Sequence, residues 1–399
     1  MSHRLIALAL ASAAVLSCGR FDSRATGEVD PLSDPSLGAA EPLGVHRREP
    51  GPVLALAIPE PGAPPMSAPA GRPSPPPAGP GPSADRLPNE LGLIPILEYH
   101  LIGDAEGRWQ RQHERFRADL ELLYRRGYRP VTLGQLVDRD LDLPAGLSPV
   151  VFTFDDASPS QFRYVEHEDG RLEIDPTSAV GIWLAFSREH PDWENKAVFC
   201  LLSGAEAGRS FFGDKGIEGQ KTKWRFSKLR FLAEQGFELC NHTLWHANLS
   251  RYEDSFVQEQ IARGVMAIDS AVPGYRVRSF SLPLGAWPKN RDLAHTGSWT
   301  EPRTGRVVGY SFDVVLEVAG GPARSPHDPQ FDPRRLPRVQ VYANELERML
   351  DHLDRSGTRY VSDGDPRTVA RLIEPAVGTS QHRGASAADA RARDSVTIP

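Results

Sequence analysis

The sequence contains little cysteine and no cluster of positive charge. Only three of the 399 residues are cysteine, and the formal net charge is −6. Proteins that bind nucleic acids carry patches of Lys and Arg; none occurs here, so we expect neither DNA nor RNA as a partner. So few cysteines also exclude a disulfide framework. Cys200 and Cys240 fall in two apolar segments that we expect to form neighbouring strands, and they either pair in an oxidising compartment or remain separate buried thiols.

The N-terminus lacks an apolar run long enough to span a bilayer. The run Leu5–Leu16 follows Arg4 and has the length of an export signal. It leads to Cys18 through the sequence VLSC, which resembles the bacterial lipobox. We therefore predict that residues 1–18 are a lipoprotein-type signal peptide and that Cys18 is lipidated. The exported protein would then be anchored to a membrane of the cell envelope, on its periplasmic or outer face. A conventional secretory signal with an incidental cysteine is the alternative.

Proline is abundant but unevenly spread. Positions 31 to 88 hold 17 of the 36 prolines, a composition that favours extended chain over a packed core. We predict a disordered Pro-rich linker over residues 19–90 and a disordered polar tail over residues 375–399. Residues 91–374 remain, and they are enough for one large folded domain.

Within this domain, short apolar runs alternate with amphipathic stretches. Strands are predicted at Leu93–His100, Val150–Phe154, Ala197–Leu202, Phe237–Cys240, Arg278–Leu282, Asp313–Val318, Val339–Val341 and Arg359–Val361, and helices at about Phe116–Tyr124, Ile182–His190, Ser227–Gln235, Glu253–Ala271 and Asn344–Arg355. Such alternation predicts an α/β fold with parallel strands, either a barrel or a doubly wound sheet. In these folds the chemistry gathers at the C-terminal ends of the strands.

Two groups of chemically active residues stand at such strand ends. Asp155 and Asp156 follow an apolar strand, and His242 and His246 follow another. An Asp pair alone often caps a turn, and two histidines alone often only pack. The histidine spacing places both rings on one face of a predicted helical turn. Together, two histidines and one carboxylate make a three-ligand metal site with a position open to water.

A zinc peptidase is the competing interpretation of this histidine pair. That motif requires Glu directly after the first histidine, and Thr243 stands there. The base must come from elsewhere, and the second carboxylate of the Asp pair is available.

The region from Ile94 to Val369 resembles the polysaccharide deacetylase family, the NodB-homology domain of carbohydrate esterase family four. The resemblance rests on TFDD at 153–156, HTLWH at 242–246, AVFC at 197–200 and FSLPLG at 280–285. The segments PILEYH at 95–100 and FDPRRLPR at 331–338 look most like exported poly-N-acetylglucosamine deacetylases.

The resemblance implies a distorted (β/α) barrel that hydrolyses N-acetyl groups of a cell-surface or extracellular polysaccharide. A divalent metal, usually Zn²⁺, would be bound by Asp156, His242 and His246. Asp155 would be the general base, and the backbone N–H of Leu284 would contact the oxyanion. This division of roles is chemically consistent, because the metal activates water while a nearby carboxylate removes its proton.

The sequence departs from the family pattern at several positions. Ala157 replaces the usual Gly after the Asp pair, and Leu284 replaces an aromatic residue. Ser281 stands where many members carry an Arg that orients the base, with Arg278 as a possible substitute.

The C-terminal Leu-x-His motif, which donates a proton to the leaving amine, is also absent. His100 is the first candidate for this acid, with His295 and His327 behind it, and a packing or surface role is the alternative for each.

Aromatic residues and loops are expected to form the substrate groove. Trp183, Trp193, Trp224, Trp245 and Trp287 are candidates to stack on sugar rings, or else core residues. Trp245, Trp287 and Pro283 are the best placed near the metal. Two insertions, at 161–192 and 204–224, are expected to lie over the face formed by the C-terminal ends of the strands.

Two other functions remain open, a non-catalytic glycan-binding lipoprotein and an O-deacetylase. The sequence does not choose among peptidoglycan, chitin-like and poly-N-acetylglucosamine polymers, and it leaves the oligomeric state open.

Overall fold

The computed structural model describes residues 86–204, 210–371 and 395–397. The predicted signal peptide with Cys18, most of the predicted linker and most of the predicted tail lie outside the described residues. Among the helices that the structure describes, none combines the length and hydropathy that a membrane crossing requires.

The centre of the fold is an eight-stranded sheet whose strands all pair in parallel. Seven strands follow one another in the order β13 (Val314–Leu316), β10 (Ser279–Ser281), β9 (Glu238–Asn241), β8 (Val198–Leu201), β5 (Ser148–Phe154), β1 (Ile96–Tyr99) and β14 (Val339–Gln340), and β4 (Tyr128–Pro130) pairs with the start of β5. The sheet curls into a half-barrel. The predicted α/β class, with a distorted barrel, is confirmed.

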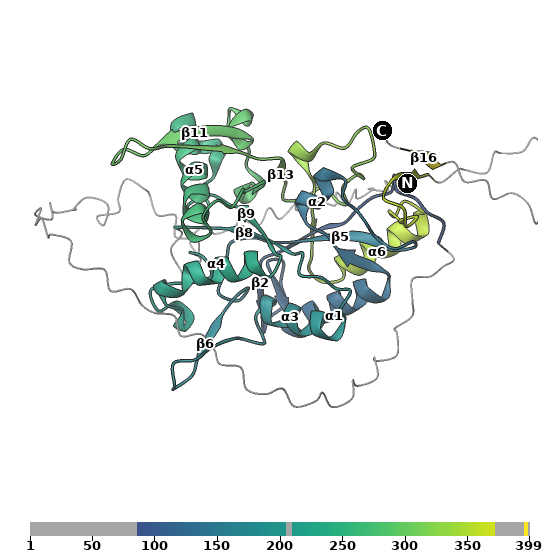
Figure 1. Cartoon of the computed structure of the whole chain (residues 1–399), viewed down its shortest axis with the longest axis horizontal. Coiled ribbons are helices and arrows are strands. Elements are labelled where there is room, and N and C mark those ends of the chain that lie inside the picture. The colour runs from purple at the N-terminus through teal and green to yellow at the C-terminus, as the bar shows by residue number, and fades with distance from the viewer. Residues whose placement is uncertain (1–85, 205–209, 372–394, 398–399) are drawn as a thin grey trace, which may run out of the picture. The chain divides into compact units, whose positions relative to one another are not determined.

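Six α-helices connect and cover the strands. They are α1 (His113–Arg125), α2 (Leu133–Asp138), α3 (Ala179–Glu189), α4 (Arg225–Glu234), α5 (Asp254–Ala271) and α6 (Glu345–Ser356) in the part of the chain described. α1, α3 and α4 lie along one side of β5 and β8, and α2 lies on the other side (Figure 1). Helix α2 was not predicted from the sequence; it begins with a capping box formed by Thr132 and Gln135.

The described residues also form four pairs of short strands and several 3-10 helices outside the main sheet. The strand pairs are β2 (Leu101–Gly103) with β3 (Gln110–Gln112), β6 (Tyr164–Glu166) with β7 (Leu172–Ile174), β11 (Thr296–Thr300) with β12 (Val307–Ser311), and β15 (Thr368–Ala370) with β16 (Ser395–Thr397). The 3-10 helices are Ile217–Gly219, Thr222–Trp224, Leu249–Arg251, Pro283–Gly285, Arg291–Ala294 and Pro333–Arg335. The strand predicted at Arg359–Val361 is wrong: Arg359 and Val361 make only isolated bridges, to Leu93 and Asn89.

Alternation along the strands separates two apolar cores. On β5, Phe152 and Phe154 pack into the larger core with the covering helices, and Val151 packs into a smaller core on the opposite face of the sheet. This is the period-two pattern of a strand buried on both faces. Cys200 on β8 and Cys240 on β9 lie in the smaller core, face each other in register and form a disulfide, which settles their pairing.

One late segment connects the two edges of the sheet. Leu336 bridges to Leu316 of β13, whereas Val339 and Gln340 pair with β1 at the opposite edge. Arg338 stands between these contacts and is fully buried. The segment Leu336–Gln340, which we call the closing segment, therefore carries an arginine into the interior of the half-barrel.

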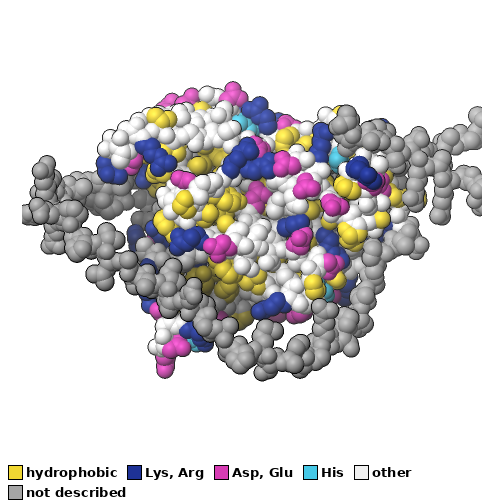
Figure 2. Space-filling view, in the orientation of Figure 1, with side chains coloured by type: hydrophobic (Ala, Val, Ile, Leu, Met, Phe, Trp, Pro, Cys, Tyr) yellow, Lys and Arg dark blue, Asp and Glu magenta, His cyan; other side chains and the backbone are white. Residues whose placement is uncertain are grey.

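The surface carries charges of both signs. Figure 2 shows Lys and Arg side chains interspersed with Asp and Glu over the displayed face. Mixed charge of this kind differs from the continuous positive stripe that a phosphate backbone selects.

Candidate metal centre and active site

The Asp pair lies where β5 ends, in a turn with unusual backbone geometry. Asp156 has φ 79° and Ala157 has φ 49°, both in the left-handed region. A side chain in this region costs about 1–2 kcal/mol, a cost that Gly at the place of Ala157 would not have. The carbonyl of Ala157 accepts a hydrogen bond of 2.9 Å from the N–H of Phe212. The second insertion thus helps to hold the turn that aims Asp156.

The histidine pair does not lie on a helical turn, so that part of the prediction is wrong. Thr243 has φ 72° and His246 has φ 64°, which interrupts any helix. Side chains shape the loop instead. Asn241 Oδ1 accepts the N–H of Thr243 at 2.8 Å, and Thr243 Oγ1 accepts the N–H of His246 at 3.0 Å. The loop still turns both imidazoles to the same side.

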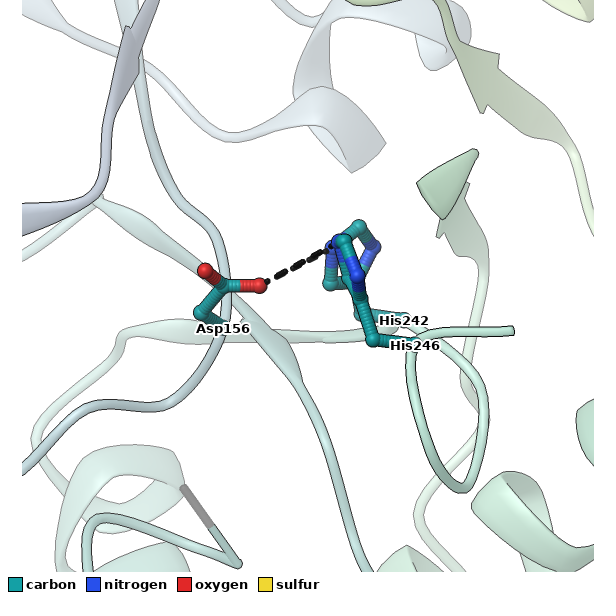
Figure 3. Close-up of side chains that lie close together, drawn as sticks. All are labelled: Asp156, His242 and His246. Carbon is teal, nitrogen blue, oxygen red and sulfur yellow. Dashed lines mark ion pairs between the residues drawn. The ribbon is translucent and has the colours of Figure 1, made fainter. Parts of the chain in front are cut away.

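Asp156, His242 and His246 converge, as Figure 3 shows. Oδ1 of Asp156 lies 3.5 Å from Nε2 of His242 and 3.5 Å from Nε2 of His246, and the three ligand atoms are all within 4.8 Å of one another. Nδ1 of His242 is 2.9 Å from the carbonyl of Ser281. That carbonyl orients the ring so that Nε2 faces Asp156, the usual outer support of a metal-binding histidine. Two imidazoles and one carboxylate are a donor set that suits Zn²⁺.

Asp156 and His242 shift each other's pKa in opposite directions. Burial alone would raise the pKa of Asp156, but the hydrogen bond and charge of His242 outweigh burial and hold that pKa below its ordinary range. Burial lowers the pKa of His242, but Asp155 and Asp156 outweigh it and raise the pKa. A bound cation would take the place of the proton that the acids draw to this histidine.

Asp155 is held by Arg338, a role that was not predicted from the sequence. Its Oδ1 and Oδ2 accept hydrogen bonds from Nη1 and Nη2 of Arg338 at 2.9 and 2.8 Å, and its Oδ2 accepts one from Ser281 Oγ at 2.9 Å. Burial raises the pKa of Asp155, but the charge of Arg338 outweighs it and lowers the pKa. Arg278 does not substitute for the missing arginine: it pairs with Asp138 and Asp313, each at 2.6 Å.

The guanidinium of Arg338 donates hydrogen bonds to two buried acids, Asp155 and Glu98. Its Nη2 also donates to Glu98 Oε1 at 2.9 Å, and its Nη1 donates to Thr153 Oγ1 at 3.0 Å. Burial raises the pKa of Glu98 to about 7. Glu98, His100 and Asp155 also lie close enough to hold a cation, but the guanidinium of Arg338 already occupies this acidic pair and repels a second positive charge.

His100 is the one proposed acid that lies in this cluster. Its Nε2 is 3.9 Å from Glu98 Oε1, and its carbonyl accepts a 2.8 Å hydrogen bond from the amide of Gln161, which also donates to the carbonyl of Asp155. Burial lowers the pKa of His100. His295 instead packs against Trp287, with ring centroids 5.8 Å apart, and the backbone N–H of His327 donates to the Ser325 hydroxyl at 3.1 Å.

The segment with the expected oxyanion contact forms a tight turn. Leu284 adopts φ 59° after the buried Pro283, and its side chain is 60% exposed. Of the tryptophans considered for sugar stacking, Trp183, Trp193 and Trp224 are buried in the protein, which agrees with the core role given as their alternative. Trp245 and Trp287 are half-buried.

A curled parallel sheet with two histidines and a carboxylate gathered at its strand ends defines a class of metal-binding α/β domains. Residues 194–296 match the family model described as polysaccharide deacetylase. The resemblance seen in the sequence is thereby confirmed. The matched region contains His242, His246, Pro283 and Leu284, whereas the Asp pair precedes it.

Similar curated proteins carry related names. A chitooligosaccharide deacetylase of Sinorhizobium fredii (strain NBRC 101917 / NGR234) is 29% identical over 111 residues, 28% of this chain and 50% of that protein. One of Bradyrhizobium sp. (strain ANU 289) is 27% identical over 115 residues, 25% of this chain and 50% of that protein. The chain thus spans about half the length of the curated relatives it matches.

Solved structures of similar proteins include IcaB from Ammonifex degensii, with TM-score 0.45 and 18% identity over 65% of this chain and 96% of that one. The Streptococcus pyogenes deacetylase PplD has TM-score 0.45 and 15% identity over 65% of this chain and 97% of that one.

Proposed function

We propose that the protein is a metal-dependent deacetylase that hydrolyses N-acetyl groups of a cell-surface or extracellular polysaccharide. The observation that carries the proposal is the convergence of Asp156, His242 and His246 beside Asp155, an acid fixed by Arg338. Relatives named chitooligosaccharide deacetylase support the choice of an N-acetylated sugar.

In this mechanism the three converging residues would hold a divalent metal, with Zn²⁺ the best fit to the donors. When bound, such an ion lowers the pKa of a water and polarises a carbonyl. Asp155 takes the proton of the attacking water. Arg338 and Ser281 fix that carboxylate, so only a small rearrangement is needed when its charge changes. The N–H of Leu284 donates to the developing oxyanion.

Breaking the amide C–N bond gives acetate and a free amine, and the amine must gain a proton as it leaves. We assign this step to His100, because of the three candidate acids it is the one that shares a cluster with Asp155. The charges of Asp155 and Asp156 favour the protonated ring, although burial outweighs them and lowers the pKa of His100.

We also propose that Cys18 anchors the exported protein to a membrane and that the linker separates the domain from the anchor. This proposal rests on the N-terminal sequence alone.

Acetate release from a panel of acetylated glycans tests the activity. The zinc-loaded protein should release acetate from N-acetylated sugars and leave a free amine, whereas Asp155→Asn should do so roughly 10² to 10⁴ times more slowly. Release from O-acetylated glycans alone would identify an O-deacetylase. Binding of glycans without any release would favour a non-catalytic glycan-binding lipoprotein, which the absence of the usual Leu-x-His acid supports.

A further inference from the structure

Trp109 is an exposed aromatic residue that lies beside the candidate site. It is the most exposed tryptophan in the described part of the chain, with 44% of its surface accessible. Its ring centroid is 4.7 Å from that of His100. His100 in turn belongs to the cluster that contains Asp155, so the indole stands at the edge of the proposed reaction centre.

The backbone around Trp109 is fixed although its ring is exposed. Its carbonyl accepts a hydrogen bond of 3.0 Å from the N–H of Leu101, directly before β3, which pairs with β2. The Arg108 guanidinium lies 5.0 Å from the centre of the indole and donates to Gln340 Oε1 at 3.1 Å. An exposed indole held in this way loses little conformational entropy when a ligand covers it.

The other tryptophans are less suited to contact a ligand. Three are core residues, as described above. Trp245 packs against Phe256 with ring centroids 5.9 Å apart, and the indole N–H of Trp287 donates to Glu317 at 3.2 Å. Trp299 is half-buried and packs against the larger core. Trp109 is therefore the indole with the most free area next to the catalytic candidates.

We propose that Trp109 forms a stacking subsite for a sugar ring of the substrate, next to the ring whose acetamide is hydrolysed. The inference rests on the proposed function. A pyranose presents a face of C–H groups, and the flat indole buries such a face while the hydroxyls stay in water. His100 contacts Trp109 and shares a cluster with Asp155, so we expect a ring stacked on the indole to be a neighbour of the reacting one. The substrate class is then an N-acetylated chain of at least two sugars.

Kinetics on substrates of different length test the subsite. In Trp109→Ala the KM for an N-acetylglucosamine tetrasaccharide should rise about tenfold, the size expected for losing an aromatic contact. The KM for the N-acetylated monosaccharide should rise less. Trp109→Phe should recover most of the affinity. Val307→Ala, which trims another exposed apolar side chain on the β11–β12 hairpin, should leave all constants unchanged. An equal rise in KM for both substrates, or no rise for either, would overturn the subsite.

A binding measurement separates this inference from the proposed activity. Calorimetric titration of the native chain and of Trp109→Ala with the tetrasaccharide, both in excess chelator, needs no turnover. Weaker binding by the variant supports the subsite even if no acetate is ever released. Acetate release together with equal tetrasaccharide binding by both proteins would leave the activity standing and overturn the subsite. No binding by the native chain would overturn it as well.

Discussion

At the scale of single residues, the adjacent acids Asp155 and Asp156 are expected to differ in role. Asp155→Asn keeps the volume but removes the proton acceptor, so turnover should fall by roughly 10² to 10⁴, the usual contribution of a positioned base, while bound metal is retained. Asp156→Asn should instead weaken the metal itself. Acetate release and elemental analysis on both variants measure the two effects. Metal loss in Asp155→Asn with full occupancy in Asp156→Asn would reverse the roles.

Glu98 provides a prediction about stability and pH in the metal-free protein. Burial raises its pKa from the ordinary 4.5 to about 7, so the folded state binds the proton more tightly than the unfolded state does. The stability that this proton provides is complete below about pH 4.5 and is lost as the pH rises through 7. Glu98→Gln should make the decline in stability smaller, and Asp119, whose pKa burial raises to about 6, should account for part of what remains. Urea unfolding at pH 5 and pH 8 measures it, and an unchanged decline in the variant would contradict the assignment.

The residues of the candidate site were only partly predictable. Asp155, Asp156, His242 and His246 could be found because each follows a strand, and parallel strands end at one edge of the sheet. Arg338 could not be assigned to Asp155, because the contact spans 183 positions and depends on how the closing segment crosses the barrel. The sequence offered one signal, because Arg338 directly precedes the predicted apolar strand Val339–Val341.

At the scale of elements, the loop that carries both histidines depends on a glycine of α5. A Cβ on Gly264 would lie 2.4 Å from Oδ1 of Asn241, the buried atom that fixes Thr243. Gly264→Ala should gain about 1 kcal/mol of helix propensity yet lower metal affinity about 10- to 100-fold, as loss of outer-shell support does. Competition with a chelator measures the affinity. Gly309→Ala, whose new Cβ has room, is the control, and equal affinities would contradict the prediction.

The same loop shows where element prediction failed. The four-residue histidine spacing suggested a helical turn, but Asn241 and Thr243 bond the backbone locally, and such side-chain bonds compete with helix formation. Longer elements were predictable because their periodicity extends over many residues, as in α5. The short helix α2 was missed although its capping box is visible in the sequence at Thr132 and Gln135.

At the scale of the whole molecule, Cys18 should decide where the protein resides. Cys18→Ala should move it from the membrane fraction to the soluble fraction, because the lipid and not the polar linker would provide the attachment. Fractionation followed by immunoblotting measures the partition. Equal membrane association of variant and native chain would show that Cys18 is incidental.

The closing segment also has a consequence for biosynthesis. A nascent chain emerges N-terminus first, so the Asp pair and both histidines are complete well before Leu336–Gln340 is made. Until then the half-barrel lacks its connection between β13 and β1, and Asp155 lacks its arginine. A chain that ends before Leu336 would carry every candidate metal ligand but no fixed base. The proposed hydrolysis would therefore become possible only when almost the entire domain has left the ribosome.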